Sequence, residues 1–166
     1  MPSIGRMCVL ALVLVSVGIF ERTPTASAEH GGIEIVKIRF NPPGPDDGSR
    51  RSLNDEYIFI RNTSSHGQGL RGWRIHDARS GNSYRIDSRT RLAPGDKLYL
   101  YTGPGPNLIG SCVDADCPRT YFYHWDKDDY VWDNEGDTAT VRRNDGSVVD
   151  RCRYSKADTS PAACGS

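Results

Sequence analysis

The feature that most constrains the fold of this chain is a series of short apolar–polar alternations, ended by Gly, Pro, Asn or Asp about every 8 to 15 residues. No long stretch repeats its apolar residues with the 3.6-residue period of an amphipathic helix. A period of two instead puts every second side chain on the same face of a β-strand. We therefore expect β-strands over residues 33–40, 56–62, 72–77, 82–87, 120–125, 137–143 and 147–154, and a turn followed by a strand within 92–103.

The number and spacing of these strands predict a fold class. Seven to nine short strands joined by turn-forming residues favour an all-β protein built as a β-sandwich. Alternation also assigns the faces, because Trp73 and Ile75 lie on one side of their strand and Arg74 on the other. In a later strand, Leu98 and Leu100 are expected to point inward.

The first 28 residues have the features of a secretory signal peptide. Arg6 supplies a positive charge, residues 8–20 are apolar, and residues 26–28 read Ala-Ser-Ala, as a cleavage site requires. The apolar run is shorter than the roughly 20 residues that span a membrane. Removing 28 of the 166 residues leaves 138, enough for one domain over residues 29–166. We expect this domain to be secreted and to have no membrane segment.

Four cysteines follow the expected leader: Cys112, Cys117, Cys152 and Cys164. An even number in an exported chain favours two disulfides, and four cysteines allow three pairings. Short loops favour pairing the first with the second and the third with the fourth. The first bridge would pin a polar, Gly- and Pro-rich loop at 102–119, and the second would tie down a C-terminal tail at 155–166.

Charge is balanced over the whole chain and uneven within it. The 21 basic and 21 acidic residues argue against a dedicated nucleic-acid or membrane-surface binder. Residues 112–137 nevertheless carry eight acidic side chains against two basic ones, and residues 50–91 carry nine arginines against four acidic residues. Arg74 and Arg85 face outward in this basic region, so a basic sheet surface could recognise phosphate-rich polymers such as wall polymers or nucleic acid. The alternative is internal pairing with the acidic segment.

Four blocks of sequence carry a resemblance to a known family: NDEYIFIRNTS from Asn54, LRGWRIHDARSGNSYRI from Leu70, LAPGDKLYLYTG from Leu92 and VWDNEGDTATVRRNDGSVVDRC from Val131. In this order they resemble the lamin-tail domain. That domain is the immunoglobulin-like module at the end of nuclear lamins, and it also occurs in many exported bacterial proteins. The resemblance covers about residues 33–154 and is greatest to short exported versions of the actinobacterial type. Its signature positions here are Asn62, Gly72, Trp73, Pro94, Gly95, Trp132, Asn134, Gly136 and Asp137.

The resemblance implies an immunoglobulin-like sandwich that acts as an accessory or interaction module. It supplies no catalytic residue and no cofactor. The sequence also lacks G-x-S-x-G and H-E-x-x-H motifs. We therefore expect a secreted, non-enzymatic binding or scaffolding module with a wall polymer, another extracellular polymer or a protein as its partner. An alternative from another class of protein is a small secreted hydrolase, in which two carboxylates are brought together in space.

The segment 130–141 holds an acidic cluster that has two interpretations. Asn134 and Gly136 tolerate positive φ, and Asp137 can accept hydrogen bonds from nearby backbone amides, so a turn before a strand is favoured. An EF-hand loop that begins at Asp133 fails because its sixth position is Thr138 and not Gly. The other interpretation is a Ca²⁺ site that is not an EF-hand, with Asp126, Asp128, Asp133 and Glu135 as candidate ligands.

Six aromatic residues within 121–132 suggest a further possibility, namely a Ca²⁺-dependent glycan-binding module that uses segment 121–137. Tyr123 and Trp125 would stack on sugar rings if they were exposed. Alternation along a strand would bury about half of these aromatic side chains instead.

Overall fold

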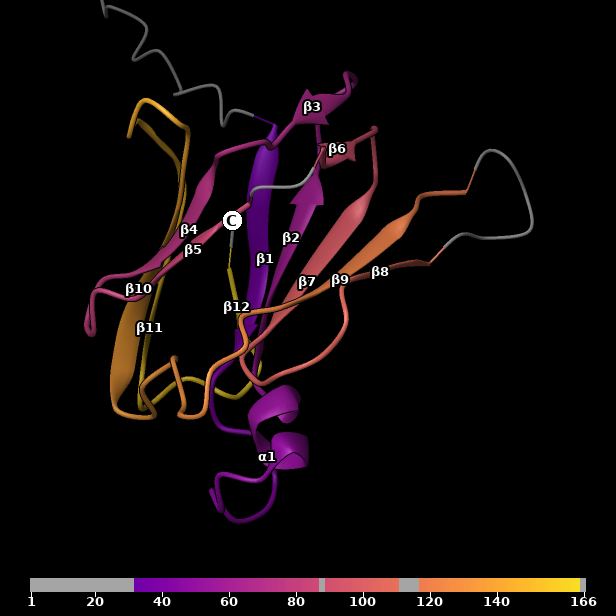
Figure 1. The fold of residues 1–166 in the computed structure, drawn as a ribbon. Coiled ribbons are helices and arrows are strands. Elements are labelled where there is room, and N and C mark those ends of the chain that lie inside the picture. The colour runs from indigo at the N-terminus through magenta and orange to yellow at the C-terminus, as the bar shows by residue number, and fades with distance from the viewer. Residues whose placement is uncertain (1–31, 87–88, 111–116, 165–166) are drawn as a thin grey trace, which may run out of the picture.

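The computed structural model describes residues 32–86, 89–110 and 117–164, which form two β-sheets in two layers with a short helix at one end (Figure 1). The expected all-β sandwich is confirmed. The expected leader lies outside the described residues. Within the described ranges, no helix is both long enough and apolar enough to cross a membrane.

The larger sheet has six strands in the order β12-β1-β2-β7-β9-β8. Neighbouring strands are antiparallel except β7 and β9, which are parallel. The bounds are Ile33–Arg39 (β1), Tyr57–Asn62 (β2), Lys97–Tyr101 (β7), Leu108–Gly110 (β8), Thr120–His124 (β9) and Ala162–Ala163 (β12).

The smaller sheet has four antiparallel strands in the order β11-β10-β4-β5. A two-stranded ribbon of β3 and β6 and the helix α1 complete the fold. The bounds are Arg50–Asp55 (α1), Gln68–Gly69 (β3), Arg74–Asp77 (β4), Ser83–Arg85 (β5), Arg91–Leu92 (β6), Gly136–Arg142 (β10) and Val148–Ser155 (β11).

The core lies between the two sheets and follows the predicted alternation. Leu98 and Leu100 of β7 are both fully buried. Trp73 and Ile75 are buried on the inner side of the smaller sheet, whereas Arg74 is exposed. Each sheet therefore has one inner face committed to the core, and its outer face remains available for contacts with other molecules.

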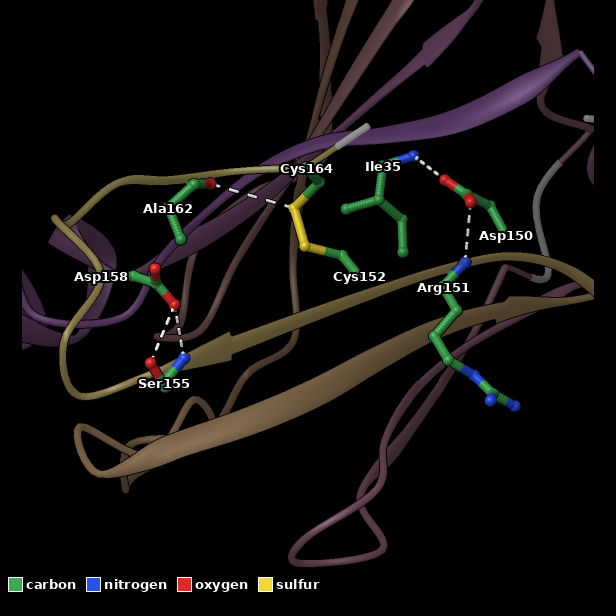
Figure 2. The surroundings of a disulfide bond; sticks show 8 residues. All are labelled: Ile35, Asp150, Arg151, Cys152, Ser155, Asp158, Ala162 and Cys164. Carbon is green, nitrogen blue, oxygen red and sulfur yellow. Dashed lines mark hydrogen bonds between the residues drawn. A yellow bond between two sulfur atoms is a disulfide. The ribbon is translucent and has the colours of Figure 1, made fainter. Parts of the chain in front are cut away.

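A disulfide closes the side of the sandwich where β11 approaches β1 (Figure 2). Cys152 of β11 is bonded to Cys164, which directly follows β12, and β12 pairs with β1. The backbone N–H of Ile35 in β1 donates to Asp150 Oδ2 of β11 at 2.6 Å. These contacts cover the long edge strand β11, which would otherwise offer unpaired backbone groups to other chains. The other expected pair includes Cys112, which lies outside the described residues, so that disulfide stays a prediction.

The expected strands do not include the two-residue strands β3, β6 and β12, the strand β8 or the helix α1. The segment 102–119 was expected to be a surface loop throughout, but Leu108–Gly110 form β8 and add an edge strand beside β9. The helix α1 occupies a segment with no strand or helix prediction. Its N-cap is Ser49, whose hydroxyl accepts from the Ser52 backbone N–H at 3.2 Å, and its single buried side chain is Leu53. One and a half turns are too short to give a helical period.

Candidate functional surfaces

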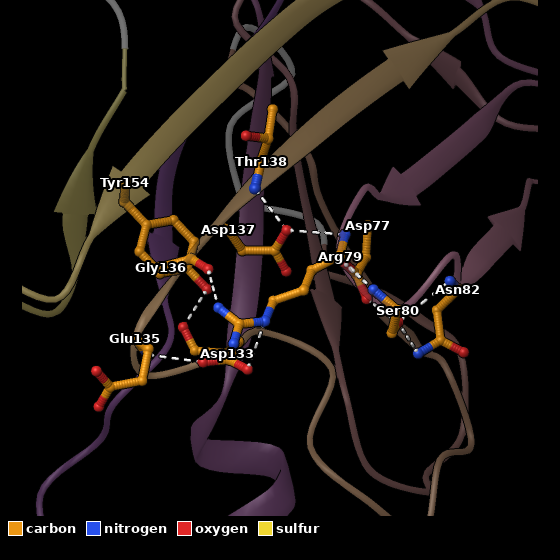
Figure 3. Close-up of polar contacts among 10 residues, drawn as sticks. All are labelled: Asp77, Arg79, Ser80, Asn82, Asp133, Glu135, Gly136, Asp137, Thr138 and Tyr154. Atoms are coloured by element: carbon orange, nitrogen blue, oxygen red, sulfur yellow. Dashed lines mark hydrogen bonds and ion pairs between the residues drawn. The ribbon is translucent and has the colours of Figure 1, made fainter.

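The acidic segment before β10 is a structural turn (Figure 3). The N–H of Gly136 donates to the carbonyl of Asp133 at 3.0 Å, and the N–H of Glu135 donates to Asp133 Oδ1 at 2.7 Å. Gly136 has a φ of +123°, a backbone conformation essentially restricted to glycine. Asp137 Oδ1 accepts from the backbone amides of Thr138 and Arg79, at 2.5 and 3.3 Å. These contacts match the turn interpretation.

Arg79 fastens this turn to the loop after β4. Its Nε lies 3.0 Å from Asp133 Oδ2, and its Nη1 donates to the carbonyl of Gly136 at 3.2 Å. Its backbone N–H donates to Asp77 Oδ1 at 2.8 Å. An arginine from the basic part of the sequence thus does pair with the acidic segment, as the internal-pairing alternative proposed.

Asp77 and Asp137 place two buried carboxyl groups side by side beneath this turn. Burial, followed by the nearby Asp77, raises the pKa of Asp137. Burial would also raise the pKa of Asp77, but interactions with Asp137, Ser80 and Arg79 outweigh it and lower that pKa. Because both groups are buried and hold backbone amides, their arrangement is that of a structural pair.

Glu135 and Asp137 do not form the open pair of carboxylates that a hydrolase needs. A hollow of about 400 Å³ beside the turn is lined by Glu135 and Asp137 among others. Glu135 forms an ion pair with Lys156 at 2.9 Å, and Asp137 holds backbone amides. The hydrolase alternative therefore gains no support from this arrangement.

The calcium candidates do not converge. Asp133 pairs with Arg79 and Glu135 pairs with Lys156, while Asp126 and Asp128 are exposed. No group of three or more His, Cys, Asp or Glu side chains in the described part of the chain is arranged to hold a metal ion. The Ca²⁺-dependent alternative therefore lacks a ligand set there.

The aromatic pair proposed for sugar stacking points inward, which corrects that expectation. Tyr123 is 5% exposed, and its hydroxyl lies 2.7 Å from Thr90 Oγ1. Trp125 is half-buried against the core and contacts Tyr84 and Trp132 edge to face. Tyr123 therefore offers no open ring face to a sugar, and the Trp125 ring is committed in part to the core.

The outer face of the smaller sheet carries a row of arginines. Arg85 of β5 lies opposite Arg74 of β4, and Arg142 of β10 lies opposite Arg74 on its other side. Arg151 and Arg153 of β11 face the same side, as the burial alternation of that strand shows. None of these five arginines, which we call the arginine face, forms an ion pair with another described residue.

The arginine face places like charges next to one another. Strands in a sheet lie about 4.8 Å apart, and like charges directly opposite each other on neighbouring strands are destabilising. No strand residue of the described chain that points to this side is acidic. Between Arg151 and His76, the hydroxyl of Thr140 is buried and forms no hydrogen bond within the described residues.

The outer face of the larger sheet carries aromatic side chains that the sequence analysis did not single out. In one row across the strands lie Phe59, Tyr99, Phe122 and Leu108; in the next lie Tyr57, Tyr101 and His124. We call these seven residues the aromatic face. Their inward neighbours along the strands, such as Ile58 and Leu100, are fully buried. Strands β2, β7 and β9 thus carry aromatic side chains on their outer side as well as buried side chains on their inner side.

A model of the lamin tail domain family matches residues 26–156. The chain belongs to the lamin tail domain family. This is a family of non-catalytic, immunoglobulin-like domains, which fits a protein without enzymatic activity. A search of curated proteins found no match to the chain.

Several signature positions of this lamin tail domain organise turns. Asn62 is fully buried; its Nδ2 donates to the carbonyls of His66 and Leu92 at 2.7 and 2.9 Å. Its Oδ1 accepts from the Ser64 N–H at 3.0 Å. Gly95 has a φ of +80°, and its N–H donates to the carbonyl of Asn62. These residues shape the end of the sandwich and point to no ligand.

The remaining signature residues also serve the fold. Gly72 has a φ of +80° and leads into Trp73, whose buried ring lies 5.5 Å from the guanidinium of Arg143. Trp132 is 1% exposed, and its backbone N–H donates to Glu56. The side chain of Asn134 donates to Asp46 at 3.0 Å. Pro94 is exposed within the turn before β7.

The aromatic face of the lamin tail domain could have been predicted from the alternation of residues along its strands. The inward assignment of Leu98 and Leu100 requires Tyr99 and Tyr101 to point outward, since neighbours alternate along a strand. Strands with one solvent-exposed face normally place polar residues on that face. Aromatic residues at the outward positions of three expected strands depart from this pattern, and they could have been identified from the sequence.

Proposed function

We propose that this lamin tail domain protein is an exported, non-enzymatic binding module whose arginine face holds an anionic, phosphate-rich polymer of the cell surface. The observation that carries the proposal is the in-register row of Arg85, Arg74 and Arg142. A row of like charges lowers stability, and an anionic chain laid across it would offset that cost. Export is supported by the leader-like residues 1–28 and by the Cys152–Cys164 disulfide.

The chemistry of arginine fits a phosphodiester ligand. The guanidinium group is planar and presents two parallel N–H donors to a phosphate, and it keeps its charge at every physiological pH. The row can therefore contact successive phosphates of an extended chain without reading the groups between them. Binding of this kind depends strongly on salt, because it releases counterions from the polymer.

The first test is co-sedimentation of the oxidised protein with purified cell walls over a range of salt concentrations, with and without EDTA. We expect pelleting that fades with salt and ignores EDTA, because the calcium candidates do not converge. Walls stripped of their phosphate polymers should no longer pellet the protein. Pelleting that EDTA abolishes would contradict the proposal.

A matched pair of variants assigns the binding to this face. The double variant Arg74→Gln, Arg85→Gln removes two charges from the row, and we expect about a tenfold loss of affinity for poly(glycerol phosphate). The control double variant Arg50→Gln, Arg51→Gln removes two exposed charges in α1, away from both faces, and should bind as the parent does. Equal loss in both pairs would show a general charge effect. Tighter binding to single-stranded DNA of the same phosphate number would assign the face to nucleic acid instead.

A further inference from the structure

The aromatic face of the larger sheet is a second surface whose construction differs from that of the arginine face. Its rings contact one another across the strands. Tyr99 sits at the centre, 4.6 Å from Phe59, 6.0 Å from Phe122, and 5.4 and 6.2 Å from Tyr57 and Tyr101 between ring centroids. The patch is therefore one continuous cluster that runs over β2, β7 and β9.

The ring faces are already occupied. Phe59 and Tyr99 are stacked at 4.6 Å with planes 9° apart, and two rings side by side in one plane cannot approach so closely. The ammonium group of Lys37 lies 5.8 Å from the centre of the Phe59 ring. Phe59 is accordingly only 8% exposed although it points away from the core. A sugar needs an open ring face, so the central rings do not form a platform for glycans.

The aromatic face instead offers ring edges and tyrosine hydroxyls to a partner. Tyr57, Tyr99 and Tyr101 are partly exposed, and Leu108 at the sheet edge is 56% exposed. Tyrosine combines a large apolar area with a polar tip and loses little conformational entropy on binding. For these reasons it is enriched in protein–protein interfaces.

Cationic side chains flank the cluster along β1 and at one end of β2 and β7. Lys37, Arg39, Arg61 and Lys97 lie on the same side of the sheet, in register with the aromatic rows or with one another. None of these four residues, which we call the cationic border, forms an ion pair within the described chain. The single acidic strand residue beside them, Glu34, accepts from the Thr63 hydroxyl at 2.8 Å.

We propose that the aromatic face docks an acidic protein segment that carries aromatic or large apolar side chains. Those side chains would pack against the ring edges, while acidic groups pair with the cationic border. A second copy of this chain is a poorer match, because its own aromatic face would bring four more cations to the contact, with Glu34 as the only acidic strand residue beside them in the described chain. This surface lies on the opposite sheet from the arginine face, so either can exist without the other.

Synthetic polypeptides test the proposal directly. Titration with a random copolymer of glutamate and tyrosine should give an affinity about tenfold higher than polyglutamate of the same length. A copolymer of lysine and tyrosine should not bind. Equal affinity for polyglutamate and the glutamate–tyrosine copolymer would overturn the proposal, because the rings would then contribute nothing.

Variants then locate the contact. Phe122→Ser and the charge reversal Lys97→Glu should each weaken binding of the glutamate–tyrosine copolymer several-fold. Lys97→Glu also keeps the test valid if Phe122→Ser fails to fold. Val148→Ser, which removes an apolar side chain that is 40% exposed on the smaller sheet, is the control and should bind normally.

Two further measurements ask whether the arginine face binds the copolymer and whether the aromatic face binds a membrane. The double variant Arg74→Gln, Arg85→Gln should retain copolymer binding, and a loss there would overturn the assignment to the aromatic face. Vesicles of phosphatidylglycerol should bind more weakly than the copolymer. Stronger binding to these vesicles, lost in Lys97→Glu, would overturn the proposal and identify the face as a membrane contact.

Discussion

Glu56, the residue before β2, accepts a hydrogen bond at 3.2 Å from the backbone N–H of Trp132, which lies 76 residues later in the chain. The same Oε1 atom also accepts from the Val131 N–H at 2.8 Å and the Thr102 hydroxyl at 2.6 Å. The side chain is fully buried, and Oε2 has no partner in the described residues. One carboxyl group thus joins the larger sheet to the segment that leads into β10.

Burial of this carboxyl group makes stability depend on pH. Burial raises the pKa of Glu56 from 4.5 to about 7, against the effect of its hydrogen bonds. The folded state therefore holds the proton more tightly than the unfolded state. The extra stability that protonated Glu56 gives the folded state is fully present below pH 4.5. It is lost as the pH rises to about 7. We expect a higher midpoint of urea unfolding at about pH 5 than at about pH 8.

Replacing the carboxyl group tests this assignment. Glu56→Gln keeps an oxygen acceptor for the three donors and removes the ionisation, so we expect it to be more stable than the parent at about pH 8. Its stability should also change less with pH. Asp137, whose pKa is raised as well, leaves part of the dependence in place. Glu34→Gln is the control, and a pH dependence that is unchanged in Glu56→Gln would contradict the argument.

Gly136 allows a second prediction, because its backbone and its surroundings both exclude a side chain. With φ at +123°, a Cβ would lie 3.0 Å from Ser155 Cα and from the Tyr154 carbonyl oxygen. We expect Gly136→Ala to lower the free energy of unfolding by about 1–3 kcal/mol. Gly146→Ala is the matched control, because its φ is +87° with open space around it. Urea unfolding of both variants measures the difference, and a larger loss at Gly146 would contradict this interpretation.

The strands could be predicted from the sequence because their signal is local. Leu98 and Leu100 alternate with their neighbours along β7, and the core repeats that alternation. The edge strand β8 could not be predicted in this way. Leu108 and Ile109 are both exposed, and they lie in a stretch rich in Gly and Pro, so no alternation of burial marks them.

The candidate surfaces were predictable only in part, because alternation fixes the face of a residue but not its neighbour on the next strand. Arg74 and Arg85 are assigned to an outer face by alternation, yet the position of Arg142 opposite Arg74 depends on pairing of β4 with a strand far along the chain. Tyr123 and Trp125 were chosen for their aromatic side chains. The outward residue between them was His124, which belongs to the aromatic face.

The disulfide gives a third prediction. Cys152 and Cys164 close a loop with a sequence separation of 12 residues, and a crosslink of this size stabilises by about 3 kcal/mol in the chain-entropy description. We expect the double variant Cys152→Ser, Cys164→Ser to unfold at lower urea concentration. Its β12 amides should exchange faster with solvent, because β12 consists of two residues only. Unchanged protection of the Ala163 amide would show that strand pairing alone holds the tail.

The arginine face gives the last prediction, in which stability and binding change in opposite directions. Arg74 has an arginine opposite it on both sides, so Arg74→Gln removes two unfavourable pairs at once. We expect a gain of about 0.2–1 kcal/mol in unfolding free energy at low salt, shrinking as salt screens the charges. Affinity for poly(glycerol phosphate) should fall in the same variant. Arg51→Gln in α1 is the control and should change neither quantity. Lower stability of Arg74→Gln at low salt would mean that the row is stabilised within the protein, and the reason for proposing an anionic ligand would be lost.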